Sequence, residues 1–265
     1  MNDIKKKNVL LSIAVIMIGL MFSGGTYAYL ARTVNTTNQI YNAKSLCFLI
    51  DYNINNVSNG QDISGTLFPS EGINGGLTGR VGLKVNSSCN LSGTGTLKLH
   101  INNGTSSSLM TPATSYCEDR STLEKINGIT TETACKADNV KGRWRGYGDS
   151  YCENPNTLER MPDYKTSSTC TSHSGTWTSG GSPLKYAIYD NATMSGNPIS
   201  KGRITSNDIN NDITIKDNIS ITTEQKYFYI YIWLDGYQTD NTFTELPFSG
   251  YISASAIQKE WCIIF

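Results

Sequence analysis

A duplicated pattern of cysteine, glutamate and tryptophan residues constrains the fold of this chain more than any other feature. The first unit, residues 116–144, contains Tyr-Cys-Glu, then Thr-Leu-Glu, then a second cysteine and finally Gly-x-Trp. The second unit, residues 151–177, repeats these landmarks in the same order, and its cysteines follow those of the first unit by 35 residues. Matching landmarks at a nearly constant offset indicate a duplication. Two units are too few for a solenoid, so we expect a pair of small knobs inserted in a larger domain.

The beginning of the chain has the order of residues that is typical of a bacterial export signal. Three lysines at positions 5–7 precede an almost unbroken apolar run at residues 9–22, and small residues follow. We expect a signal peptidase to cleave between Ala28 and Tyr29. The apolar run is too short to span a bilayer comfortably, which needs about 20 apolar residues. Extended through Gly24, Gly25 and the two tyrosines it just reaches that length, so a retained single-pass anchor helix is the alternative. Either outcome places the rest of the chain outside the cytoplasm.

The seven cysteines are best interpreted as a disulfide framework, because regularly spaced thiols outside the cytoplasm are usually oxidised. We expect one disulfide within each unit, worth about 3 kcal/mol, and a third between Cys47 and Cys89. A zinc site with four thiolates is the alternative, although zinc ligands usually come in closer pairs. The sequence leaves the state of Cys262 open. The expected disulfide residues are Cys47, Cys89, Cys117, Cys135, Cys152 and Cys170.

Outside the duplicated segment, apolar and polar residues alternate with the period of two that is typical of β-strands. No segment after the signal has convincing helical periodicity. Short strands between turns rich in Gly, Asn and Ser predict an all-β antiparallel sandwich. We expect strands at residues 46–52, 81–85, 97–101, 184–189, 213–221, 225–234 and 249–257.

These features divide the chain into six segments. The order is a signal peptide or membrane anchor (1–28), a polar linker arm (29–44), the first part of the sandwich (45–110), the duplicated insert (111–181), the second part of the sandwich (182–258) and a hydrophobic tail (259–265). The chain has 22 basic and 22 acidic residues, a balance that excludes the basic footprint of a nucleic-acid-binding protein.

Aromatic residues form two candidate interaction surfaces. In the insert, Trp144 and Trp177 either plug the small cores of their units or form, with Tyr147 and Tyr151, an exposed platform for a glycan or a peptide. In the strand at 225–234, the aliphatic residues share one face and belong in the sandwich core. The opposite face is aromatic, and either the chain's own loops or insert cover it or it is a contact surface. That face consists of Tyr227, Tyr229, Tyr231 and Trp233.

Residues able to carry catalysis or hold a metal form no recognisable constellation in the sequence. His100 and His173 are the only histidines, and neither belongs to the His-Glu-x-x-His motif of zinc proteases. The Gly-x-Ser-x-Gly nucleophile elbow is absent as well. Residues 207–212 offer several oxygen atoms but lack the spacing and closing glutamate of an EF-hand loop. We therefore expect no catalytic residue, no metal and no cofactor.

The lysine cluster, the apolar run and the segment 25–29 together resemble the signal of the TasA/camelysin group, exported proteins of Gram-positive bacteria. Segments 47–48, 81–89, 229–236 and 248–256 are similar to uncharacterised proteins of gut Firmicutes. The resemblance covers the signal and the two β portions and not the insert. It implies a dedicated signal peptidase, a jelly-roll-like sandwich and a role at the cell surface or in a biofilm matrix, including that of a fibre subunit.

The sequence thus predicts an exported structural or adhesive surface protein without catalytic activity. A carbohydrate- or protein-binding module that uses Trp144 and Trp177 is the main alternative. A camelysin-like metalloprotease is a further one, for which the motif is missing. Expected partners are a signal peptidase, other copies of the chain, cell-surface or matrix components and a glycan, with the membrane added if the anchor is retained. For fibre assembly, we expect the arm at 32–44 to be donated to an open sheet edge of a neighbour.

Overall fold

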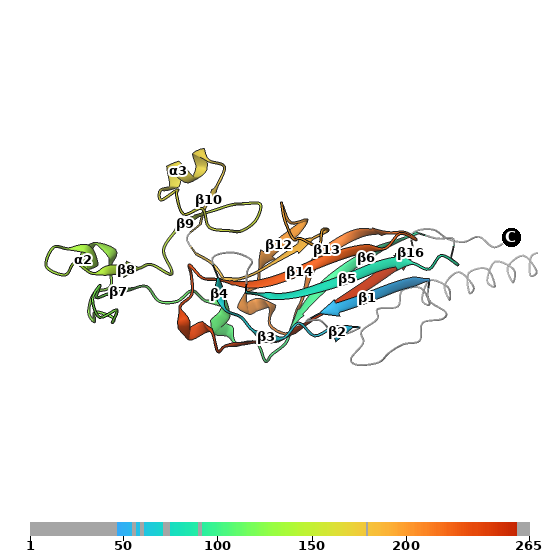
Figure 1. Ribbon diagram of the computed structural model, residues 1–265, viewed down its shortest axis with the longest axis horizontal. Coiled ribbons are helices and arrows are strands. Elements are labelled where there is room, and N and C mark those ends of the chain that lie inside the picture. Colours follow the sequence, from blue (N-terminus) through green and yellow to red (C-terminus); the bar gives the residue numbers. More distant parts are fainter. Residues whose placement is uncertain are drawn as a thin grey trace, which may run out of the picture.

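The computed structural model describes residues 47–54, 57–58, 61–70, 75–89, 92–178 and 180–258 (Figure 1). The predicted signal or anchor with its cleavage site at Ala28 and Tyr29, the linker arm, the hydrophobic tail and Cys262 lie outside the described residues. Over the described part the protein is mostly β, with antiparallel sheets and only short helices. None of the helices described there is long and apolar enough to cross a membrane.

The larger sheet contains seven strands in the order β12-β11-β14-β5-β1-β2, with β4 pairing with β14. All neighbours are antiparallel except β14 and β4. The strands are β1 (Phe48–Ile54), β2 (Val57–Ser58), β4 (Pro69–Ser70), β5 (Leu77–Val85), β11 (Leu184–Tyr189), β12 (Ser200–Arg203) and β14 (Lys226–Asp235). Because β14 lies between β5 and β11, the parts of the chain before and after the insert form one sheet.

The second sheet consists of β13 (Asp212–Ile221), β6 (Gly93–Ile101) and β16 (Gly250–Gln258), in that order. β3 (Gly65–Thr66) and β15 (Pro247–Phe248) form a separate small antiparallel pair. Three short 3₁₀ helices, η1 (Ser107–Met110), η2 (Ser206–Asp208) and η3 (Asn241–Phe243), lie in the connections.

The two sheets enclose one hydrophobic core, which makes the fold a β-sandwich. Leu97 and Leu99 of β6 and Ile230 and Ile232 of β14 are completely buried in the same cluster. These residues alternate with more exposed ones along β6, as the period of two predicts. Burying a side chain of this size contributes about 1.5–3 kcal/mol.

Each of the seven predicted strands corresponds to an observed strand, which confirms the period-two interpretation. The starts of β5 and β6 differ, because both strands begin four residues earlier than expected. The additional residues include Gly79 and Gly93, which lack the apolar side chain that marks a core-facing position. A Cβ atom at Gly79 would overlap the side chain of Ile54, and one at Gly93 would overlap the ring of Phe48. Glycine therefore makes room for larger neighbours at both positions.

Both units of the insert fold into the same small structure, an antiparallel ribbon of two strands with a short helix between them. The first unit contains β7 (Tyr116–Glu118), α2 (Glu132–Lys136) and β8 (Arg143–Arg145). The second contains β9 (Tyr151–Glu153), α3 (Ser167–Ser172) and β10 (Thr176–Thr178). The two units lie at the end of the sandwich opposite to the start of β1 (Figure 1).

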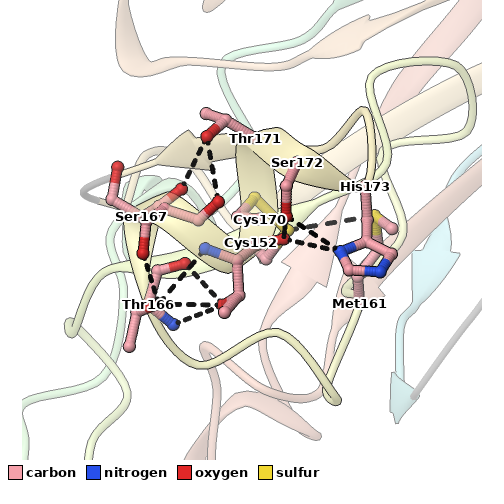
Figure 2. The surroundings of a disulfide bond; sticks show 10 residues. Cys152, Met161, Thr166, Ser167, Cys170, Thr171, Ser172 and His173 are labelled. Carbon is pink, nitrogen blue, oxygen red and sulfur yellow. Dashed lines mark hydrogen bonds between the residues drawn. A yellow bond between two sulfur atoms is a disulfide. The ribbon is translucent and has the colours of Figure 1, made fainter.

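All three predicted disulfides are present. Cys117 is bonded to Cys135 and Cys152 to Cys170, each pair with a Cα–Cα distance of 5.4 Å, and Cys47 is bonded to Cys89. In each unit the bond joins the first strand to the helix, as Figure 2 shows for the second unit. Because the four thiols of the units are consumed in disulfides, the zinc alternative is wrong.

The glycine of each Gly-x-Trp landmark has a structural reason. A Cβ atom at Gly142 would overlap the sulfur atoms of the first disulfide, and one at Gly175 would overlap those of the second. The leucine of each Thr-Leu-Glu landmark adopts a left-handed backbone, with φ of 61° at Leu123 and 60° at Leu158. The two units therefore share the backbone conformation at this landmark as well as its sequence.

Candidate functional site

The second unit is anchored to the larger sheet through a buried cluster of charged residues. Lys185 of β11 is only 1 % exposed, and its Nζ donates to Asp235 Oδ2 at 2.7 Å and to Glu153 Oε2 at 3.1 Å. It also donates to the carbonyl oxygen of Leu158 at 2.6 Å. Arg203 of β12 pairs with the same Glu153 carboxylate. Two cations and two carboxylates thus compensate one another between the unit and the sheet, as buried charges require.

We call Lys185, Asp235, Glu153 and Arg203 the anchor cluster. Tyr151 packs within this cluster and is not part of an exposed platform, so the platform expectation is wrong for this residue. Its side chain is buried, and its hydroxyl lies 3.0 Å from Glu153 Oε2 and accepts from Arg203 Nη2 at 3.0 Å. Gln238 Oε1 is 3.2 Å from the same hydroxyl. Burial raises the pKa of Tyr151 well above its ordinary value, so the phenol stays neutral within the cluster.

The aromatic face of β14 is largely covered by the chain itself. Tyr231 and Trp233 are buried in a second small apolar cluster, against which Leu158 of the second unit and Met194 pack. The alternative that these two residues form a contact surface is therefore wrong. Tyr229 is half-buried, and Tyr227 is 37 % exposed with the Arg80 guanidinium 4.7 Å from its ring centre. The remaining exposed part of this face is thus confined to the start of β14.

The first unit satisfies its corresponding carboxylate internally. Glu118, which corresponds to Glu153, is bonded by Arg143 and Arg145 of its own ribbon. The hydrogen bond from Arg145 is the main reason why the pKa of Glu118 is below its ordinary value. In the second unit threonines replace both arginines. As a result Glu153 is free to bind Lys185 and Arg203 of the sheet.

A groove of about 1540 Å³ runs between the two units and the loop that follows β14. Trp144, Tyr147 and Trp177 all line it, so the structure brings together three of the four residues expected in the platform. Both tryptophans are half-buried, which combines the plug and the platform interpretations. The indole Nε1 of Trp144 donates to Asp149 Oδ2 at 2.7 Å, which fixes its ring.

The rest of the groove wall mixes aromatic rings with charged groups of both signs. Tyr116 and Tyr147 have ring centres 6.2 Å apart, and Arg160 lies 4.6 Å from the ring centre of Tyr237. Carboxylates and amides provide acceptors, whereas the basic side chains provide donors. The polar lining residues include Glu118, Glu132, Arg145, Asp149, Arg160, Lys165, Asp240 and Asn241. Such a wall combines flat apolar surfaces with many hydrogen-bonding positions.

The two histidines and the oxygen-rich loop 207–212 make hydrogen bonds and ring contacts with neighbouring residues of the chain. His100 Nδ1 is 2.8 Å from Asp212 Oδ1, and its ring stacks on Tyr251. His173 stacks on Tyr164. In the loop 207–212, Asp208 Oδ2 accepts from the backbone N–H of Thr205. Within the described ranges, His, Cys, Asp and Glu side chains form no group of three or more that could hold a metal ion.

The sequence reasoning missed the anchor cluster. Its signal is the single charged residue in the otherwise apolar strand at 184–189, together with the glutamate of each Tyr-Cys-Glu landmark.

Three disulfides within one chain are typical of proteins that fold in an oxidising, extracellular environment. Comparisons with protein-family models, with curated proteins and with solved structures give no match to this chain.

Proposed function

We propose that this chain is an exported, non-enzymatic adhesive protein of the cell surface or extracellular matrix. In this proposal a jelly-roll-like sandwich of the TasA type is the support, and the two stapled units are the binding head. The groove between the units, lined by Trp144, Tyr147 and Trp177, is the observation that carries the proposal. The position of the head supports it as well, because the units stand at the end of the sandwich opposite to the start of β1 (Figure 1). A chain attached through its N-terminal segment would present them outward.

The head is built to keep its shape when it binds. Each unit has a disulfide between its first strand and its helix, and the second unit is also fixed by the Lys185 cluster. A site that is ordered before binding loses less conformational entropy on association. Small units without a core of their own could not provide this order without crosslinks.

A glycan is the ligand class that the groove favours. The indole faces of Trp144 and Trp177 match the C–H faces of pyranose rings in shape and polarity. Asp149, Asp240 and Asn241 provide acceptors for sugar hydroxyl groups along the same wall. Since both acidic and basic groups line the groove, a neutral or zwitterionic glycan fits better than a polyanion.

Glycan-array binding by the full chain tests this proposal. We expect binding by the wild type and an increase of about tenfold or more in Kd for Trp144→Ala and for Trp177→Ala, which corresponds to a loss of roughly 1.4 kcal/mol. Tyr227→Ala is the matched control, because it removes an exposed aromatic ring outside the groove. Failure of a folded wild-type chain to bind any glycan, or equal affinities for all four proteins, would refute the assignment.

Assembly into fibres is a second candidate function, and an open sheet edge favours it. Residues Phe48 to Tyr52 of β1 pair with β5 on one side. On the other side β2 pairs only with Asn53 and Ile54, and no other described strand pairs there. Unpaired backbone groups at such an edge accept a strand from a neighbouring molecule. Electron micrographs should show fibres of the chain cleaved after Ala28 and none of the uncleaved chain; fibres of both forms would contradict donation of the freed arm.

A further inference from the structure

The anchor cluster contains a buried lysine directly beside a carboxyl group. Lys185 Nζ lies 2.7 Å from Asp235 Oδ2, and a second carboxylate oxygen, Glu153 Oε2, lies 3.1 Å from the same nitrogen. The three side chains are 1 %, 5 % and 7 % exposed, respectively. Lysine is almost never this buried, and the desolvation cost of such ion pairs can exceed their attraction. Apolar residues would hold β11 against β14 at least as well, so the arrangement calls for a chemical explanation.

We propose that Lys185 and Asp235 join in an intramolecular amide bond, with Glu153 as the group that moves the proton. Nζ attacks Cγ of Asp235, so that a C–N bond forms and the bond from Cγ to Oδ2 breaks. Of the three protons on the lysine ammonium, one stays on the amide nitrogen and two leave with Oδ2 as water. Glu153 accepts a proton from Nζ and returns it to the departing oxygen. The step needs no oxidant, no reductant and no other reactant.

The geometry around Asp235 supports this reaction. Its other oxygen, Oδ1, accepts a hydrogen bond from the backbone N–H of Tyr237 at 3.0 Å. A fixed N–H donor at this position stabilises the negative charge that develops on Oδ1 when the nitrogen attacks. Lys185 is opposite Trp233 in the antiparallel register of β11 and β14, so the lysine reaches diagonally to the aspartate. Two groups held so close on adjacent strands react as if at very high concentration.

The balance of buried charges is the same before and after the reaction. Arg203 pairs with Glu153, while Lys185 is shared between Glu153 and Asp235. Formation of the amide removes one cation and one anion together. The remaining pair, Arg203 and Glu153, still compensates itself, so no buried charge is left without a partner.

The first unit provides a natural comparison within the same chain. Its corresponding carboxylate, Glu118, contacts only guanidinium groups among its ion-pair partners, those of Arg143 and Arg145. Guanidinium stays protonated and is a poor nucleophile, so no such bond is expected there. A bond between Lys185 and Asp235 would close a loop of 50 residues and lock β11 to β14 beneath the second unit. This inference does not depend on the identity of the ligand in the groove.

Peptide mapping of the full chain tests the bond. After denaturation, reduction and digestion, we expect one branched peptide that contains both Lys185 and Asp235, with a mass one water below the sum of its two parts. Recovery of both peptides unlinked from the wild type would overturn the proposal, whatever the variants do. A branch at any other lysine would also overturn it.

Variants assign the roles. Lys185→Arg and Asp235→Ala should abolish the branched peptide, whereas Lys201→Arg, a change on the neighbouring strand β12, should retain it. Glu153→Gln keeps the size of the side chain and one acceptor oxygen but removes the base, so the linked fraction should fall from most chains to a small minority. A fully linked Glu153→Gln chain would refute the proton-transfer role of Glu153. If a variant does not fold, the wild-type digest still decides whether the bond exists.

Discussion

Leu123 and Leu158 occupy the same position in the two units but have different surroundings, which provides a substitution with its own control. Leu158 is half-buried and packs against the cluster of Tyr231 and Trp233 on the sheet. Leu123 is 61 % exposed. Both residues have a left-handed backbone, with φ near 60°. Replacement by alanine therefore changes the backbone strain equally in the two units, and only the packing differs.

The expected magnitudes follow from burial. Complete burial of a leucine side chain is worth about 1.5–3 kcal/mol, and Leu158 is partly exposed. We therefore expect Leu158→Ala to lower the free energy of unfolding of the second unit by about 1–2 kcal/mol, including a share for the space that is left. Leu123→Ala should stay within about 0.5 kcal/mol of the wild type, as is usual for exposed positions.

Hydrogen exchange under native conditions is the appropriate assay, because a unit can open locally while the sandwich stays folded. Protection of the β9 and β10 amides should fall in Leu158→Ala, and protection of β7 and β8 should be unchanged in Leu123→Ala. Equal losses of protection in both variants would show that the leucine stabilises only its own unit and that its contact with the sheet adds nothing. An unchanged Leu158→Ala protein would refute the docking of Leu158 on the sheet as a source of stability.

Three further outcomes are expected. Replacing Cys152 and Cys170 by serine should lower the free energy of unfolding by about 3 kcal/mol, the entropy of a loop of this length; urea titration measures it, and an unchanged midpoint would contradict the estimate. Gly142→Ala should prevent closure of the first disulfide, because its Cβ would overlap the sulfurs; thiol titration should then find two additional free thiols, and finding none would refute the overlap. The pKa of Glu118 is lowered chiefly by the hydrogen bond from Arg145, so its stabilising contribution is present above the unfolded pKa of about 4.3 and is lost as the pH falls through the lower folded pKa. Arg145→Thr removes the main cause of this shift, so the first unit of the variant should be less stable than the wild type at neutral pH and should lose less stability during acid titration; coincident profiles would contradict this.

Much of the fold could be predicted because its determinants are local. Alternation along β6 and β14 predicts strands with one core face, and the equal spacing of the cysteines predicts the disulfides of the units. The glycines at the starts of β5 and β6 remove the apolar marker from core positions, which explains why those strands were expected to be shorter. The pairing of β14 with both β5 and β11 depends on contacts between distant segments, which periodicity does not specify.

The candidate site was predictable only in part, because the burial of its residues depends on which unit of the insert packs against the larger sheet. Alternation in β11 places Lys185 on the outer face of the sheet, where a lysine would normally be solvated. It is buried because the second unit covers that face. The prediction for Tyr151 is wrong for the same reason, since an aromatic residue in a small unit is assumed exposed until the surface against which it packs is known.

One difference between the units lies at the two positions that flank each tryptophan. Arginines there, Arg143 and Arg145, satisfy the glutamate within the first unit. Threonines there, Thr176 and Thr178, leave Glu153 to the sheet, and the second unit becomes part of the sandwich. The exchange changes the charge partners of the glutamate without changing the fold that the two units share, and the units are attached differently. The groove lies between these two units. The sandwich fixes the position of the second unit through Glu153, whereas the glutamate of the first unit is paired within that unit.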